Sequence, residues 1–405
     1  MSPPLAGVKV IDITTVVMGP YATQILGDLG ADVVKIESPE GDNTRHAGPM
    51  RHRSMGDRFL HLNRGKRSVV LNLKHPDGRS ALLKLIESAD VLIYNVRPQA
   101  MARLGLSYAD VSAVNKKIIY VGAYGFSQRG PYASRPAYDD LIQGMAAIPW
   151  LIAKAGLSEP GYIPATLVDR IVGLHVVYAV TAALFQRTKQ EVGQAIEVPM
   201  FEAISEMVLG DHLGGHTFVP PLGEPGYDRV LATERRPYKT RDGYICVLIY
   251  NDKQWRSFFK LIGREKEFNV SSYFATHECR ARHPAKVNEF VAQQMASRSS
   301  REWLDLLSSG DIPAATLNSL EDLIDDPHLA AIGFFTKAEH PSEGPILTMA
   351  PTIRWLSHSS CQSRPAPRLG EHSVEVLREI GYSQAELAKL IAAGATVDGN
   401  SLAGD

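Results

Sequence analysis

The stretch VKVIDITTVVMGPYATQILGDLGADVVKIE, residues 8–37, decides the fold. β-Branched residues are concentrated at residues 8–13 and 31–37, and a segment with helical apolar periodicity, residues 20–29, separates them. This order is typical of a strand, a helix and a second strand in a parallel sheet. Gly30 stands where a helix commonly ends on a capping glycine.

The same pattern continues along the chain. Residues 68–73 and 90–95 predict strands around a helix at residues 75–89, and residues 117–125 predict one more strand. Together with the two strands of the opening stretch they give five. The sequence therefore predicts an α/β fold with a doubly wound sheet, whose ligands bind beyond the carboxyl ends of the strands.

The turn after the first strand does not favour a dinucleotide site. It holds a single glycine, Gly19, followed by Pro20 and Tyr21, and Glu37 ends the second strand. A dinucleotide fingerprint needs glycines for the turn, for approach of the pyrophosphate and for helix packing. We therefore expect a Rossmann-like unit that does not bind NAD.

A change in composition marks a second domain, because PPLGEPGY at Pro220–Tyr227 concentrates Pro and Gly as a linker does. Beyond it, a turn at Asp242 and Gly243 precedes a strand and a helix-rich stretch, and Gly381 separates two helices of the tail. The predicted layout is a first part of the large domain over residues 1–205, a linker over 206–227, a small α+β domain over 228–315, and a linker with the return to the large domain over 316–405.

Composition excludes several classes of protein. The chain has 405 residues, with 43 Lys and Arg against 44 Asp and Glu, so its net charge of -1 offers no basic field to nucleic acid. The three cysteines lie far apart, which signals neither a disulfide framework nor a zinc cluster. The apolar stretch Ile171–Phe185 is shorter than the roughly 20 residues that cross a bilayer and predicts a buried helix. We expect a cytoplasmic protein without nucleic-acid or membrane partners.

Two features suggest a binding or catalytic site. Asp169 directly precedes the apolar helix, where it is either a helix N-cap or a carboxylate exposed for nucleophilic attack, and spacing alone leaves both open. His175, on the apolar face, favours a core role. A basic segment after the second strand either contacts phosphate or carboxylate groups or simply solvates a loop. Its arginines are Arg45, Arg51, Arg53 and Arg58.

The chain resembles the class III CoA-transferases of the CaiB/BaiF type over nearly its whole length. The resemblance rests on an ordered series of motifs: the opening stretch with SPEGDNTR, LNRGKRSVVLNLKHPDGR, NVRPQAMARLGLSY, GFSQRGPYASRPAYDDLIQGM, VDRIVGLHVVYAVTAALF, GQAIEVPMFEA, RPYKTRDGYI, IPAATLNSLEDLIDDPHL and PRLGEHSVEVLREIG. It implies a Rossmann-like large domain built from N- and C-terminal parts, a smaller domain, and an interlinked homodimer.

The resemblance also implies the site. The family's catalytic aspartate falls on Asp169, in the context VDxxxG. The implied contacts to CoA are Val16, Leu71, Lys74, Asn95, Arg103, Tyr138, Asp139 and Met200, and we add Arg97 from its place beside them. Arg45 and Tyr138 are the expected substrate contacts. CoA or acyl-CoA is then a substrate, and we expect no permanently bound cofactor and no metal.

The implied reaction moves CoA from an acyl-CoA thioester to a free carboxylic acid, such as a small dicarboxylate. It proceeds through an acyl anhydride and an aspartyl-CoA thioester on Asp169. Members that act on oxalate carry Gln where this chain has Val17 and a run of glycines where it reads LATERRPYKTRDGYI, so oxalate is not expected. Many members have Arg where this chain has Ser38.

Two alternative functions stay open. α-Methylacyl-CoA racemases share the resemblance but place His where the motif PAYD of this chain has Tyr138, and a phenol of pKa about 10 is a poor base at neutral pH. The second alternative is a non-catalytic acyl-CoA-binding subunit. The presence of Asp169 argues against it.

Overall fold

A computed structural model describes residues 2–157, 159–271, 273–356 and 364–401. The chain divides into two compact units, which we call the large and the small unit. The large unit comprises Met1–Ala146, Ile163–Glu206 and Ala330–Asp405, and the small unit comprises Ala147–Tyr162 and Met207–Leu329. The predicted small domain, residues 228–315, lies within the small unit, which also takes in residues 147–162 from the predicted large domain.

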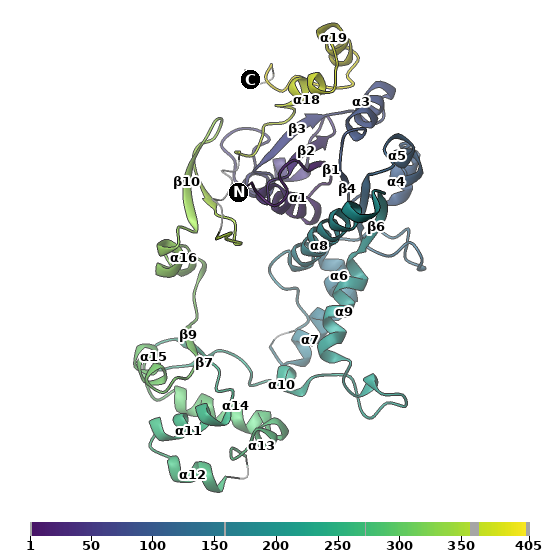
Figure 1. The fold of residues 1–405 in the computed structure, drawn as a ribbon. Coiled ribbons are helices and arrows are strands. Elements are labelled where there is room, and N and C mark those ends of the chain that lie inside the picture. The colour runs from purple at the N-terminus through teal and green to yellow at the C-terminus, as the bar shows by residue number, and fades with distance from the viewer. Residues whose placement is uncertain (1, 158, 272, 357–363, 402–405) are drawn as a thin grey trace. The chain divides into compact units, whose positions relative to one another are not determined.

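The large unit is built on a wholly parallel sheet of six strands in the order β3-β2-β1-β4-β5-β6 (Figure 1). The strands are β1 (Lys9–Ile13), β2 (Asp32–Glu37), β3 (Lys66–Val70), β4 (Val91–Tyr94), β5 (Ile119–Tyr124) and β6 (Gln194–Pro199). The predicted α/β class and the five predicted strands are confirmed. The sixth, β6, was not predicted, because Gln194 and Glu197 interrupt its apolar residues at the partly exposed edge of the sheet.

The strand order reverses between β1 and β4. Chain segments leave these two neighbouring strands in opposite directions, which opens a crevice beyond their carboxyl ends. Thr14 follows β1 and Asn95 follows β4 at this point. The sheet therefore places the loops after β1 and β4 on either side of one crevice.

Helices cover both faces of this sheet. They are α1 (Met18–Asp28), η1 (Asn43–His46), α2 (Asp57–Leu62), α3 (Pro76–Ile86), α4 (Pro98–Arg103), α5 (Tyr108–Val114), α6 (Asp139–Met145), α8 (Leu167–Gln190), α18 (Ser373–Glu379) and α19 (Gln384–Ala392). Helices α1 and α8 pack against each other. A Cβ atom at Gly173 of α8 would lie 3.0 Å from the carbonyl oxygen of Met18, so the glycine permits this close approach.

Helix α8 is longer and more exposed than the sequence predicts. Its 24 residues make it long and apolar enough, by length and composition, to cross a membrane, since a window of 18 residues within it has a mean hydropathy of 1.6. One face of the helix, with Val172, Val176 and Val180, is fully buried within the large unit. The opposite face is not, because Tyr178 and Phe185 are 58% and 64% exposed. The prediction of a buried helix therefore holds for one face only.

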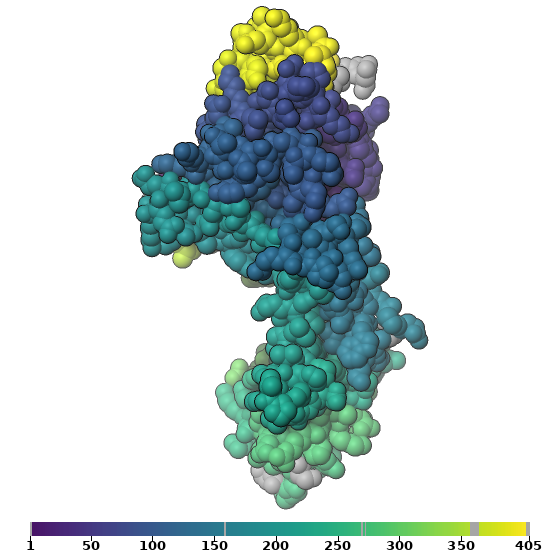
Figure 2. Space-filling view, turned by 90° about the vertical axis from the view of Figure 1, so that its right-hand side faces the viewer, coloured from purple at the N-terminus to yellow at the C-terminus, as the bar shows by residue number. Residues whose placement is uncertain are grey.

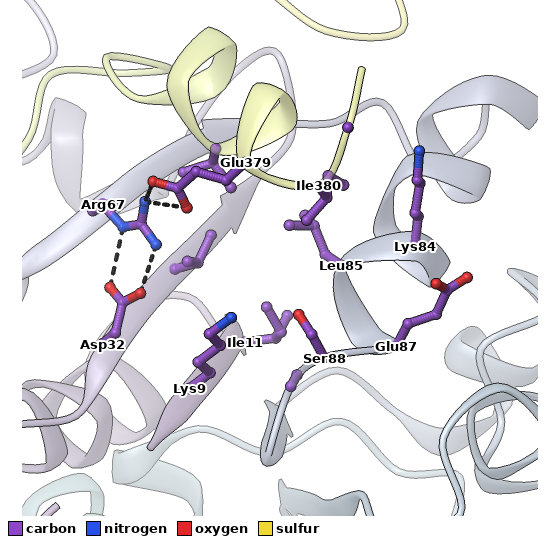
Figure 3. Close-up of a pocket in the computed structure, with 14 residues that line it drawn as sticks. Lys9, Ile11, Asp32, Arg67, Lys84, Leu85, Glu87, Ser88, Glu379 and Ile380 are labelled. Carbon is purple, nitrogen blue, oxygen red and sulfur yellow. Dashed lines mark hydrogen bonds and ion pairs between the residues drawn. The ribbon is translucent and has the colours of Figure 1, made fainter. Parts of the chain in front are cut away.

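The C-terminal segment returns onto the edge of the sheet at β3. Figure 2 shows the C-terminal residues, in yellow, against the purple and blue surface of the N-terminal residues. The Thr396 hydroxyl donates to the carbonyl oxygen of Val70 at 2.6 Å. Beside a cavity at the amino ends of β1 and β2, Arg67 bonds both to Asp32 and to Glu379 of α18 (Figure 3). These contacts attach the tail to the first strands of the chain.

The small unit has an antiparallel three-stranded sheet of β7 (Tyr238–Lys239), β8 (Tyr244–Val247) and β9 (Ala314–Thr316). Its helices are α7 (Ile148–Lys154), η2 (Gly214–Thr217), α10 (Asp228–Leu231), α11 (Asp252–Leu261), α12 (Glu265–Val270), α13 (His277–Arg282), α14 (Pro284–Met295), α15 (Ser300–Ser309) and α16 (Leu320–Ile324). Aromatic residues dominate its core, among them Trp255, Phe258, Phe259 and Trp303. Helices α9 (Met200–His212) and α17 (Pro327–Ala331) cross the unit boundaries, and β10 (Phe335–His340) and β11 (Gly344–Met349) form a hairpin of the large unit.

Candidate active site

A pocket of about 410 Å³ lies in the crevice between the loops after β1 and β4. All of its lining residues belong to the large unit. They are Thr15, Val16, Val17, Met18, Asn43, Asn95, Val96, Arg97, Ala100, Tyr124, Gly125, Arg135, Pro136, Ala137, Tyr138, Asp169 and Met200. This is the position that a doubly wound sheet provides for a ligand.

Side chains from other elements fix the loop after β1. The Asn95 amide bonds to both backbone polar groups of Thr15, accepting from its N–H at 3.0 Å and donating to its carbonyl oxygen at 2.8 Å. The next residue, Val16, has φ of 73°, a left-handed conformation that a β-branched residue rarely adopts. The Val16 N–H donates to Asp42 Oδ1 at 3.2 Å. The wall of the pocket is thus held in a specific and unusual conformation.

Asp169 lies in the first turn of α8 and lines the pocket. The helix begins at Leu167 and its N-cap is Thr166, so of the two alternatives for Asp169 the N-cap is wrong. Its backbone N–H donates to Asp139 Oδ2 at 2.9 Å. The other oxygen of Asp139 accepts from Gln143 at 2.6 Å, and the Gln143 carbonyl accepts from the Ile163 N–H at 2.9 Å. This chain of bonds fixes the turn that carries Asp169.

The surroundings of Asp169 disfavour its charged form. Burial, and next the negative charge of Asp139, raise its pKa from 3.8 to about 7, although Arg170 acts in the opposite direction. The positive end of the helix dipole near Asp169 favours the ionised carboxylate, but burial and Asp139 outweigh it. Near neutral pH the carboxylate and the carboxylic acid coexist, and the carboxylate is poorly solvated. A poorly solvated carboxylate is a stronger nucleophile than one in water.

The structure brings together six of the predicted site residues. Asp169 and five predicted CoA contacts line the pocket, namely Val16, Asn95, Arg97, Tyr138 and Met200. Asp139 lies behind Asp169 and accepts a hydrogen bond from its backbone N–H. Three others lie outside the lining: Leu71 is buried beside Thr396, and Lys74 and Arg103 are exposed. Contacts of these three with CoA stay predictions.

Arg45 is placed differently from the expectation. Its side chain is fully buried, with Nη2 2.7 Å from Glu37 Oε1 and the guanidinium 3.6 Å above the Phe59 ring. It also donates to the carbonyl oxygen of Pro367 at 3.2 Å. The ion pair outweighs burial and lowers the pKa of Glu37 to about 2. We therefore correct the prediction of Arg45 as a substrate contact: the residue joins the chain segments behind the pocket.

Sequence reasoning missed several residues of the pocket. Arg135 lines it immediately before the motif PAYD, and Tyr124 ends β5 there and donates to Glu197 at 2.9 Å. Its position as the last residue of a strand, at the carboxyl edge of the sheet, was the signal that could have identified Tyr124. Asp42 and Gln143 act behind the wall through hydrogen bonds. No local pattern marks these two residues.

Comparison with known proteins identifies the family. The sequence profile of CoA-transferase family III matches residues 5–373. The chain belongs to CoA-transferase family III. It is accordingly an enzyme, a class III CoA-transferase, as its motifs indicate.

Individual relatives agree with this assignment. The chain is 31% identical over 386 residues to a succinate–glutarate CoA-transferase of Agrobacterium fabrum, covering 93% of this chain and 96% of that protein. It is 31% identical over 417 residues to a formyl-CoA:oxalate CoA-transferase of Streptomyces coelicolor, covering 96% of this chain and 98% of that protein. A solved CaiB/BaiF family protein from Brucella suis superposes with a TM-score of 0.78 at 29% identity, covering 94% of this chain and all of the other. The α/β architecture of this transferase is thus that of CaiB/BaiF proteins.

Proposed function

We propose that this transferase moves CoA from an acyl-CoA thioester to a free carboxylic acid through covalent intermediates on Asp169. The observation that carries the proposal is the position of this residue. Its carboxyl group has a raised pKa and lines the pocket at the point where the strand order reverses. Five residues predicted to bind CoA line the same pocket. The nucleophile and the thioester would therefore share one cavity.

In the proposed sequence, a carboxylate oxygen of Asp169 attacks the thioester carbonyl of the donor. The C–S bond breaks, which gives a mixed anhydride and the CoA thiolate. The thiolate attacks the Asp169 carbonyl carbon of the anhydride, which releases the donor acid as its carboxylate and leaves an aspartyl-CoA thioester. The acceptor carboxylate then runs the same steps in reverse. Its acyl-CoA departs, and the Asp169 carboxylate is regenerated without net transfer of a proton.

We further propose a small dicarboxylate as substrate. The names of the relatives include succinate, glutarate and oxalate. Two cationic side chains of the pocket wall, Arg97 and Arg135, have no ion-pair partner among the described residues. Arg97 donates to the carbonyl oxygen of Ser134 at 3.1 Å, and the Arg135 guanidinium lies 4.0 Å from the Tyr132 ring centroid. A second carboxylate is the group such guanidinium forks bind best. Val17 stands where oxalate-specific members carry Gln, so we favour a longer diacid.

A trapping experiment tests the covalent mechanism. The enzyme is incubated with succinyl-CoA and then with hydroxylamine, and the peptide containing Asp169 is analysed by mass spectrometry. We expect a hydroxamate at Asp169, and we expect Asp169→Ala to fold, to bind CoA and to lack turnover. A racemase would instead exchange the α-hydrogen of its acyl-CoA in deuterated water. Such exchange without a trapped aspartyl species would refute the transferase mechanism.

We also propose that the enzyme is a cytoplasmic homodimer, interlinked as the family resemblance implies. The apolar side chains on the open face of α8, among them Leu174, Tyr178 and Phe185, support association because water would otherwise contact them. Light scattering after size-exclusion chromatography measures the mass. We propose no resident cofactor. Among the described residues, no group of three or more His, Cys, Asp or Glu side chains is arranged to hold a metal ion.

A further inference from the structure

An ion pair lies buried directly behind the active-site loop. Lys35 Nζ of β2 stands 3.0 Å from Asp42 Oδ2, and both side chains are fully inaccessible to water. A buried ion pair is weak evidence of stabilisation, because desolvation of its charges offsets their attraction.

Both partners bind the backbone of the loop that follows β1. Lys35 Nζ donates to the carbonyl oxygen of Thr14 at 2.8 Å, and Asp42 Oδ1 accepts from the Val16 N–H at 3.2 Å. Thr15, between them, is held by Asn95. Three consecutive residues of the pocket's approach are thus each bound by a side chain from another element.

The conformation that these bonds hold is one that the sequence alone disfavours. Val16 has φ of 73°, and its branched Cβ makes the left-handed region unfavourable. Val16 and the next two residues line the pocket, and α1 begins at Met18. Without the Asp42 carboxylate, the Val16 N–H would lose its acceptor and the loop could relax toward ordinary backbone angles. Such a change would move the wall that faces Asp169.

We propose that the Lys35–Asp42 ion pair is a positioning device, which sets the conformation of residues 14–16 for the transfer reaction at Asp169. This inference rests on the proposed function, because it takes the pocket as the place of acyl transfer. Asp42 and Lys35 touch no substrate in this scheme. They act through the loop backbone, and Asp42 is a positioning residue.

The surrounding carboxylates keep the Lys35 side chain protonated. Burial alone would lower the pKa of Lys35, but the carboxylates of Asp12 and Asp42, and more weakly Glu37, raise it above its ordinary value. Asp12 in turn pairs with Lys66 at 3.0 Å and accepts from the Thr14 N–H at 2.9 Å. Lys35 therefore stays protonated throughout the neutral range.

The test compares variants that separate the loop contact from the charge. Asp42→Ala removes the acceptor of the Val16 N–H, whereas Asp42→Asn keeps an oxygen there but removes the charge and places an amide NH2 group, a donor, against Lys35. The control is Asp28→Asn, which breaks the ion pair with Arg64, 2.7 Å long and partly buried, at the far end of α1. Thermal unfolding, kcat, and the KM for succinyl-CoA are measured for each, with kcat expressed per folded protein.

We expect kcat of Asp42→Ala to fall about tenfold or more, as displacement of a catalytic wall by a fraction of an ångström does, with a smaller change in KM. The kcat of Asp42→Asn should fall between that of Asp42→Ala and that of the wild type, and Asp28→Asn should keep the wild-type kcat. A folded Asp42→Ala with wild-type kcat and KM would overturn the inference. If Asp42→Ala does not fold, Asp42→Asn decides, because unchanged kcat there also overturns it. Failure to trap Asp169 in the wild-type enzyme would refute the proposed function instead.

Discussion

Replacing the proposed nucleophile should make the protein more stable at alkaline pH. In the folded chain the pKa of Asp169 is raised from 3.8 to about 7 by burial and by the neighbouring Asp139. Above neutral pH the folded enzyme therefore holds a carboxylate in a place where the protonated acid is preferred. Asp169→Asn keeps the shape of the side chain and removes the charge. The substitution should relieve this cost while it abolishes transfer.

The sign and size follow from the linkage between protons and folding. Well below pH 3.8 the carboxyl is protonated in both the folded and the unfolded chain, so it does not change the free energy of unfolding. As pH rises from 3.8 to 7 the unfolded chain loses its proton first, so the wild type loses stability, and the loss is complete above pH 7. A shift of this size corresponds to about 4 kcal/mol, at about 1.4 kcal/mol per pKa unit. Water at the open side of the pocket screens the charge, so we expect about 1–4 kcal/mol.

Urea unfolding at pH 4.5, 6 and 8 measures this difference. The stability gain of Asp169→Asn over the wild type should be small at pH 4.5 and largest at pH 8. Glu87→Gln, which neutralises an exposed acid of the same unit, serves as the control and should show no such growth. A gain that is constant across the three pH values, or that shrinks toward pH 8, would show that the carboxylate of Asp169 is not disfavoured in the folded enzyme.

Two further predictions concern the neighbours of the nucleophile. Asp139→Asn removes the negative charge beside Asp169, so the acid limb of the plot of kcat against pH should move to lower pH. The variant also loses one of the two hydrogen bonds of Asp139, which lowers the maximal kcat. An acid limb that does not move would contradict this prediction. Arg135→Gln should raise the KM for glutarate at least several-fold more than the KM for butyrate, since only the diacid presents a second carboxylate. Equal increases for both acids, measured beside the same-loop control Arg129→Gln, would assign Arg135 to CoA instead.

The parts of the fold that depend on local pattern could be predicted from the sequence. β-Branched runs fixed β1 and β2 within a residue or two, because buried parallel strands need apolar side chains on both faces. The edge strand β6 was not predicted, because one side of it is not covered and its pattern of apolar and polar residues is mixed. The start of α8 was misplaced for a related reason: Leu167 and Val168 carry no capping signal, so Asp169 looked like the cap.

The parts of the site that depend on distant contacts could not be predicted in this way. Arg45 stands in a run of basic residues and looks available to a ligand, but Glu37 and the Pro367 carbonyl, 322 residues away, take up its guanidinium. Asp42 is likewise an ordinary turn residue in the sequence. Only the folded sheet brings its carboxylate to the Val16 N–H. Motif resemblance pointed to Asp169 as the catalytic aspartate. It gave Asn95 and Asp139 as CoA contacts and not as residues that hold the backbone of Thr15 and Asp169 in place.

The energetics of the pocket explain why so many buried charges stand behind it. An aspartate with a raised pKa and a valine in the left-handed region are both unfavourable locally. Each is bound through its backbone N–H by an aspartate, Asp139 for Asp169 and Asp42 for Val16. Those two aspartates are themselves bound, by Gln143 and by Lys35. A strained group can persist only where its supports are more rigid than it is, and the carboxyl end of a six-stranded buried sheet supplies such supports on both sides of the crevice.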